Sequence, residues 1–116
     1  MAVGKRLICA RQDLEEGGRG VRFEVTRAGE VQPAFVIRFA GVARAYLNRC
    51  GHIPVELDYL PGDFFDLSRL YLVCATHGAL YDPATGTCLG GRCNGRGLTP
   101  LPVVEEADGI YLMEER

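Results

Sequence analysis

Residues 34–48 read AFVIRFAGVARAYLN, and this stretch decides the fold class. Apolar and polar or small side chains alternate in its first half, which places Phe35, Ile37 and Phe39 on one face of a strand. Gly41 stands where a tight hairpin turn is expected. After it, residues 42–48 carry aromatic and aliphatic side chains on both faces, a pattern typical of a strand buried on both sides. The stretch therefore predicts a β-hairpin with a buried second strand.

Strand patterns recur on either side of this hairpin. Residues 21–26 alternate strictly between apolar and polar side chains, and a polar loop is expected to separate them from a first strand at residues 7–9. Near the end of the chain, residues 103–104 and 110–113 flank Ala107-Asp108-Gly109. This tripeptide is a hairpin signal of the Asp-Gly type. These patterns predict further antiparallel strand pairs at both ends of the chain.

The window from Asp63 to His77 contains no glycine or proline and is ambiguous. Its spacing of apolar residues would also suit one face of a helix, formed by Phe64, Leu67, Leu70, Tyr71 and Cys74. Residues 70–73, which read LYLV, nevertheless form a good strand. We expect a turn around residues 66–68 followed by a strand.

Turn-forming residues dominate the rest of the chain. Residues 82–86 read DPATG and predict a tight turn between strands at residues 79–81 and 87–89. The 15 glycines and six prolines leave few windows that are long enough for a helix. The predicted fold class is therefore all-β, built from small antiparallel sheets, in a single domain over residues 1–116.

Composition excludes several classes of function. The chain has 116 residues and a formal net charge of −2, which argues against nucleic acid as its main partner. No apolar run approaches the roughly 20 residues that span a bilayer. The first residues lack the apolar stretch and cleavage site of a secretory signal. We therefore expect a cytoplasmic protein without a membrane partner, in which five cysteines favour thiol or metal chemistry over disulfides.

The residues that carry chemistry form two pairs. Cys50-Gly51-His52 and Cys74-Ala75-Thr76-His77 contain both histidines of the chain, each two or three positions after a cysteine. Thiolate and imidazole together suit zinc or an iron–sulfur centre, and not magnesium or calcium. A zinc finger usually places its two cysteines on one element and its two histidines on another. Here each segment offers one of each, as a cluster with two cysteines on one iron and two histidines on the other requires.

Segments around these pairs extend the pattern. They read NRCGH at residues 48–52, CATHGALYD at 74–82, TG at 85–86 and LTPLPV at 98–103. With them the sequence resembles the Rieske 2Fe–2S ferredoxin family, from about Leu7 to the C-terminus. The resemblance implies a fold of three small antiparallel sheets. It also implies a cluster-binding part, roughly residues 48–95, at one tip of the molecule.

The resemblance further implies one 2Fe–2S cluster, with Cys50 and Cys74 on one iron and His52 and His77 on the other. It implies a one-electron carrier with no catalytic residues, and not an enzyme. Its partners would be a flavin-containing NAD(P)H reductase and a terminal oxygenase, often one that dihydroxylates aromatic rings. Because both histidines serve as ligands, the chain cannot supply the two-histidine, one-carboxylate iron site of a large Rieske oxygenase.

Differences from high-potential family members bear on the reduction potential. Rieske proteins of respiratory complexes carry an extra cysteine in each cluster loop and usually a serine, where this chain has Val55, Thr76 and Ala79. Gly51 and Gly78 still leave room for backbone N–H groups to approach the sulfides. With fewer hydrogen bonds to sulfur, we expect a potential near the low end of the Rieske range, roughly −150 mV.

Two other functions fit the same motifs. One is a small Rieske-like subunit of a nitrite reductase, and the other is an interaction module stabilised by zinc. The remaining cysteines, Cys9, Cys88 and Cys93, are expected to serve as small apolar packing residues. A Cys88–Cys93 bridge is disfavoured in the cytosol.

Four acidic residues lie between the two motifs, namely Glu56, Asp58, Asp63 and Asp66. They are either a docking face that attracts a basic partner or an ordinary solvated loop. Tyr81 either donates a hydrogen bond to a ligand sulfur or simply packs.

Overall fold

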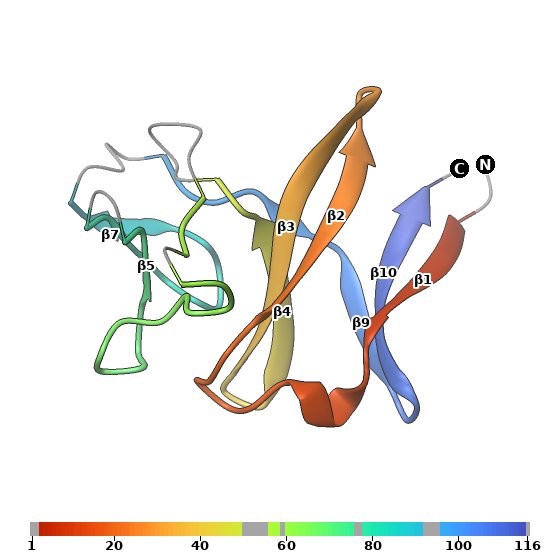
Figure 1. Ribbon diagram of the computed structural model, residues 1–116, viewed down its shortest axis with the longest axis horizontal. Coiled ribbons are helices and arrows are strands. Elements are labelled where there is room, and N and C mark those ends of the chain that lie inside the picture. The colour runs from red at the N-terminus through yellow and green to blue at the C-terminus, as the bar shows by residue number, and fades with distance from the viewer. Residues whose placement is uncertain (1–2, 50–55, 59, 76–77, 92–95, 116) are drawn as a thin grey trace.

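The computed structural model describes residues 3–49, 56–58, 60–75, 78–91 and 96–115. Within these residues, ten strands form three antiparallel sheets, and one short 3₁₀ turn, η1 (Arg11–Asp13), lies between β1 and β2 (Figure 1). The all-β fold class and the three small antiparallel sheets expected from the sequence are confirmed. None of the helices among the described residues is long and apolar enough to cross a membrane.

The three sheets have distinct places along the chain. The terminal sheet joins the two ends of the chain, in the order β1 (Val3–Cys9), β10 (Gly109–Glu115) and β9 (Val103–Glu106). The central sheet contains β2 (Val21–Arg27), β3 (Glu30–Phe39), β4 (Val42–Leu47) and β8 (Pro100–Leu101). The small sheet contains β5 (Leu72–Val73), β6 (Leu80–Tyr81) and β7 (Cys88–Gly90). In Figure 1 the central sheet lies between the other two.

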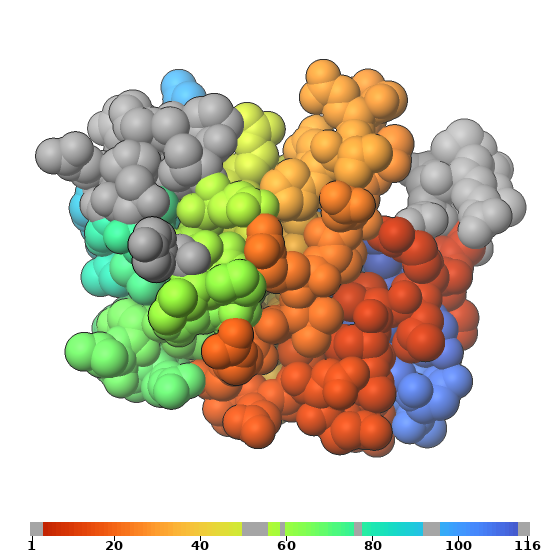
Figure 2. Space-filling view, in the orientation of Figure 1, coloured from red at the N-terminus to blue at the C-terminus, as the bar shows by residue number. Residues whose placement is uncertain are grey.

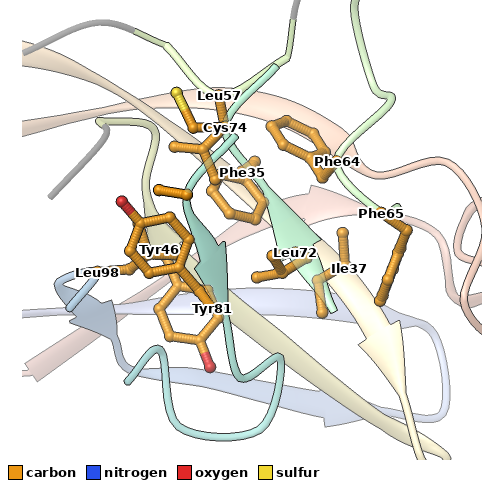
Figure 3. Packing of buried hydrophobic residues seen from close by; sticks show 11 residues of the cluster. Phe35, Ile37, Tyr46, Leu57, Phe64, Phe65, Leu72, Cys74, Tyr81 and Leu98 are labelled. Atoms are coloured by element: carbon orange, nitrogen blue, oxygen red, sulfur yellow. The ribbon is translucent and has the colours of Figure 1, made fainter. Parts of the chain in front are cut away.

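The central sheet is buried on both faces, which the pattern of residues 42–48 predicts for the strand after the turn. The strand before the turn was expected to be half-buried, but residues 34–37 are all buried. Side chains on one face of β3 and β4 pack with the small sheet and its loops; these are Phe35, Ile37 and Tyr46 (Figure 3). The Phe35 ring stacks on Phe64 at a centroid distance of 4.0 Å. Smaller side chains on the opposite face pack against the terminal sheet, and these include Ala34, Val36, Ala45 and Leu47. The period-two alternation therefore separates two cores that share one sheet.

The ambiguous window forms a turn followed by a strand, as expected. The Asp66 carbonyl accepts a hydrogen bond from the Arg69 N–H, and the strand β5 begins at Leu72. This strand is shorter than the LYLV pattern predicts. Leu67 lies fully exposed at the turn, whereas a helix would have buried it beside Phe64. Residues 82–86 also form the expected turn between β6 and β7.

Two hairpins of the central sheet have turns that hold alanine in the left-handed region. Ala28-Gly29 joins β2 to β3 with φ angles of 52° and 79°, and Ala40-Gly41 joins β3 to β4 with 53° and 78°. Such two-residue turns follow the twist of a hairpin, but a left-handed alanine costs about 1–2 kcal/mol. At the second turn the Glu16 carboxylate offsets this cost, because it accepts hydrogen bonds from both turn N–H groups, at 2.6 and 2.7 Å.

The hairpin near the C-terminus differs from the sequence-based interpretation. Glu106 pairs with Gly109, so the turn is Ala107-Asp108 and Gly109 already belongs to β10. Neither turn residue has a positive φ. The glycine instead permits close packing on β1, because a Cβ at Gly109 would lie 3.0 Å from the Cys9 carbonyl oxygen and 2.6 Å from the end of the flexible Leu7 side chain. The hairpin was predicted correctly, but its turn lies one residue earlier.

The strained turn at Ala28 provides a test of this backbone geometry. We expect Ala28→Asn to raise the free energy of unfolding by about 0.5–1 kcal/mol, because asparagine adopts positive φ at lower cost. Chemical denaturation would measure the change. Ala107→Asn is the matched control at an exposed two-residue turn without positive φ, and it should give no gain. An equal gain in both variants would contradict this reading of the turn.

An ion pair joins the central and terminal sheets. The Arg38 guanidinium on β3 donates two hydrogen bonds of 2.8 Å to the Glu105 carboxylate on β9, and Arg11 donates a third at 2.9 Å. These hydrogen bonds from Arg38 and Arg11 lower the pKa of Glu105 from 4.5 to about 2. Arg38 and Glu105 are mostly buried, with 15% and 21% of their side-chain surfaces exposed.

This ion pair predicts how stability depends on pH. Because the pKa of Glu105 is lowered in the folded state, its contribution is fully present above pH 4.5 and is lost as the pH falls towards 2. Glu105→Gln should lower the free energy of unfolding by about 1–2 kcal/mol at pH 7. The difference between the variant and the natural protein should shrink as the pH falls from 5 to 2.5. A difference that stays constant over this range would show that the charge of Glu105 contributes nothing.

Candidate metal centre

The structure describes one of the four expected ligands. Cys50, His52 and His77 lie outside the described residues, whereas Cys74 is described and follows β5 directly. The side chain of Cys74 is completely buried. Its sulfur points away from the aromatic rings of the core (Figure 3). Cys74 belongs to the core cluster that also contains Phe35 and Leu57, and its thiol is a soft donor of the kind that binds iron.

The segment that follows Cys74 is closed by its own backbone. The Gly78 N–H donates a hydrogen bond to the Cys74 carbonyl at 2.7 Å, and the Cys74 N–H donates one to the Ala79 carbonyl at 2.9 Å. Gly78 has a φ of +71°, and among the described residues no atom lies within 4 Å of the position that its Cβ would take. The backbone therefore turns tightly between β5 and β6 and leaves space beside Gly78.

The strand β7 supports this turn from the other side. A Cβ at Gly91 would lie 2.9 Å from both the Ala79 Cα and the Gly78 carbonyl oxygen, so only glycine permits this close approach. Gly91 also has a φ of +81°. Gly90, directly before it, has open space around its Cβ position. Gly91 therefore holds the residues after the second Cys–His pair in place.

A buried polar network joins the two ends of the segment that contains the first pair. Asn48 is fully buried, and its side-chain oxygen accepts a hydrogen bond of 2.8 Å from the Leu57 N–H. The Asn48 amide nitrogen donates to the Asp58 carboxylate at 2.9 Å. Asp58 also accepts a hydrogen bond of 2.9 Å from the Gly62 N–H. Residues before and after the Cys50–His52 pair are thus held together through side chains.

A cation on the neighbouring strand completes this network. Arg22 on β2 lies 3.5 Å from the Asp58 carboxylate through Nε and 2.7 Å from Glu56 through Nη2. In the space-filling view the yellow-green surface of the segment after residue 55 lies directly against the orange surface of β2 (Figure 2). The charge of the buried Asp58 carboxylate is therefore balanced from the central sheet.

The position of Asp58 shows that the interpretation of the acidic residues between the two Cys–His pairs was wrong for this residue. Sequence patterns place Asp58 with Glu56, Asp63 and Asp66, either on a docking face or in a solvated loop. The side chain of Asp58 is fully buried, so it belongs to neither. Its role, and that of Asn48, was missed because charge along a sequence does not show which carboxylate faces inward. A polar residue directly after a strand buried on both faces was the available signal for Asn48.

The remaining described cysteines have different roles. Cys9 is a free thiol whose burial raises its pKa to about 11, so it packs as an apolar residue, as expected. Cys88 packs against the core but is also disulfide-bonded, which corrects the expectation of packing alone. Cys93 lies outside the described residues. Tyr81 is fully buried in the core of the small sheet, so packing is at least part of its role.

Solved structures with this fold include several ferredoxins. The chain matches the ferredoxin of carbazole 1,9a-dioxygenase from Nocardioides aromaticivorans IC177 with a TM-score of 0.69 and 20% identity, over 97% of this chain and 98% of that one. It matches the Sphingomonas yanoikuyae B1 ferredoxin with a TM-score of 0.69 and 22% identity, over 97% and 100%. A chain from a complex of reduced oxygenase and oxidized ferredoxin in carbazole 1,9a-dioxygenase gives a TM-score of 0.72 and 22% identity, over 97% and 94%. No curated protein matches the sequence.

A family model decides the class of protein. The model of the Rieske [2Fe-2S] domain matches residues 5–105, which include both Cys–His pairs. The chain therefore belongs to the Rieske [2Fe-2S] domain family, whose cofactor is one 2Fe–2S cluster. The described part of the centre fits this group. Cys74 offers a buried thiol, which is a soft ligand suited to iron, beside Gly78, whose Cβ position meets no atom of the described residues within 4 Å.

The two glycines before residue 92 test how the turn after Cys74 is supported. Gly91→Ala should lower the free energy of unfolding by about 1–3 kcal/mol, since it combines positive φ with two contacts of 2.9 Å. Gly90→Ala should change it by less than about 1 kcal/mol, because its Cβ would meet open space. Thermal or chemical denaturation would measure both. Equal losses in the two variants would contradict a specific supporting role for Gly91.

Proposed function

We propose that this chain is a one-electron carrier that passes electrons from a flavin-containing NAD(P)H reductase to a terminal oxygenase. The observation that carries the proposal is the family match, because it spans both Cys–His pairs within a domain of the Rieske type. The ferredoxin chains with the same fold support it, and one of them comes from a complex with an oxygenase. A Rieske cluster, when bound, takes up and releases one electron.

The proposed ligands are Cys50 and Cys74 on one iron and His52 and His77 on the other. The position of Cys74 directly after β5 and its burial support its place in this set. Ala79 is fully buried where high-potential members usually have serine, so its side chain offers no hydroxyl to a sulfide. This supports a potential near the low end of the Rieske range.

Electron transfer requires a ligand segment that moves little and a ligand close to the surface, and this chain's own residues would provide both. Hydrogen bonds from the Gly78 N–H to the Cys74 carbonyl and from the Cys74 N–H to the Ala79 carbonyl hold the residues on either side of this ligand segment, which would keep reorganisation small. An imidazole ligand whose edge reaches the surface would be the natural exit for the electron. No acid–base residue is required. We therefore propose that the protein is an electron carrier and not an enzyme. We further propose that residues 1–116 form a single domain and that the protein lies in the cytoplasm.

The cluster and its ligands predict a specific spectrum. Protein purified without oxygen should contain two irons and two acid-labile sulfides per chain. After reduction with dithionite, its EPR spectrum should show the low average g that mixed cysteine and histidine ligation produces. Redox titration followed by EPR should give a midpoint of roughly −150 mV. His77→Cys should change the spectrum while still permitting a cluster.

Several results would contradict the proposal. Stoichiometric zinc without sulfide would favour the zinc-stabilised module, and a spectrum unchanged by His77→Cys would remove His77 from the site. A potential well above zero would contradict the argument from Ala79. Capture of a nitrite reductase, and not an oxygenase, on the immobilised protein would favour the reductase subunit.

A further inference from the structure

We propose that Asn48 and Asp58 are positioning residues that fix the two ligand segments of the cluster relative to each other. The inference rests on the proposed ligand set, and it concerns two buried side chains outside that set.

Asn48 uses each of its groups for a different neighbour. Its backbone N–H donates to the Pro33 carbonyl at 2.8 Å, which ties it to β3. Its side-chain oxygen accepts from Leu57, and its side-chain nitrogen donates to Asp58. Leu57 and Asp58 lie beyond the Cys50–His52 pair, whereas Asn48 precedes it. A single buried amide therefore closes the segment that carries two of the four proposed ligands.

The buried Asp58 carboxylate favours one arrangement of the segment between Asn48 and Leu57. One carboxylate oxygen accepts from Asn48 and the other from Gly62, and Arg22 lies 3.5 Å away. The side chain of Asp58 has no exposed surface. A buried carboxylate is tolerated only with such partners, so another residue at position 48 would leave it incompletely satisfied. The pair therefore favours one arrangement of the segment over others.

Leu57 transmits this arrangement to the second segment. Its N–H donates to Asn48, while its carbonyl accepts a hydrogen bond of 3.0 Å from the Ala75 N–H. Ala75 directly follows the proposed ligand Cys74. The side chain of Leu57 is fully buried in the core that also contains Cys74. A displacement of Asn48 or Asp58 would therefore change how both sulfur ligands are presented.

The network can be broken and restored by exchanging its two side chains. Asn48→Asp places two carboxylates in contact, and Asp58→Asn turns an NH₂ group towards either the Asn48 amide or the Gly62 N–H. In the double variant N48D/D58N, the carboxylate at position 48 can accept from Leu57 and from the amide at position 58. The carbonyl oxygen of that amide can still accept from Gly62. The Leu57 and Gly62 N–H groups and both exchanged side chains regain a partner, while the single negative charge moves from position 58, beside Arg22, to position 48.

The experiment compares the reconstituted natural protein with N48D, D58N and the double variant. We expect the rate at which a chelator removes the cluster to be roughly tenfold higher in each single variant, because a lost charge-assisted hydrogen bond changes an equilibrium constant about tenfold or more. The EPR spectrum and the midpoint potential should also shift. The double variant should recover both, with a rate of cluster loss within about threefold of the natural protein.

Glu105→Gln is the matched control, because it breaks another mostly buried carboxylate network without contact to either ligand segment. It should lower stability but leave the spectrum and the potential unchanged.

Each outcome decides the proposal. Single variants with the natural spectrum and potential would overturn it, and so would a double variant that recovers neither. If N48D does not fold, D58N and the double variant still show whether the natural EPR spectrum and midpoint potential are lost and then recovered. A natural protein without a Rieske spectrum would overturn the proposed function as well, and this result is distinct from a normal spectrum that the variants retain.

Discussion

Burial of β3 on both faces is the constraint on which the rest of the molecule depends. Large rings face one side of the central sheet and small side chains face the other. The large face requires a cover, which the small sheet and its loops provide through Phe64 stacked on Phe35. The small face permits close approach of the terminal sheet, and the Arg38–Glu105 pair fixes that approach from the edge. The central sheet thus locates the part of the chain that carries the proposed ligands.

Apolar packing locates this part but does not orient the ligand segments within it, since the hydrophobic effect has no direction. Direction comes from hydrogen bonds at the points where strands end. Asn48 follows β4, Cys74 follows β5, and Gly91 follows β7. At each of these points a specific contact replaces sheet pairing. A rigid sheet with directed contacts at its strand ends is a general way to support a cofactor on loops.

Much of the fold and of the site could be predicted from the sequence. Alternation in residues 21–26 and 34–48 identified strands because each face meets a different environment. The two Cys–His pairs identified the family, since the spacing of ligands within a segment is a local property. The failures concern contacts between distant residues. Gly109 lies close to the Cys9 carbonyl, Asp58 is buried by β2 and Asn48, and Cys88 is bonded to another cysteine. None of these contacts is visible in a local pattern.

The pairing of the first and last strands has a consequence for how the protein is made. Val3 lies opposite Glu115, and the sheet that contains them receives β9 and β10 only from the end of the chain (Figure 1). On the ribosome, the consecutive hairpins of β2, β3 and β4 can form early, because their contacts are local. β1 must wait, unpaired, until residues 109–115 of β10 have been synthesised. Its exposed edge during that interval is a site where a chaperone or a neighbouring nascent chain could bind.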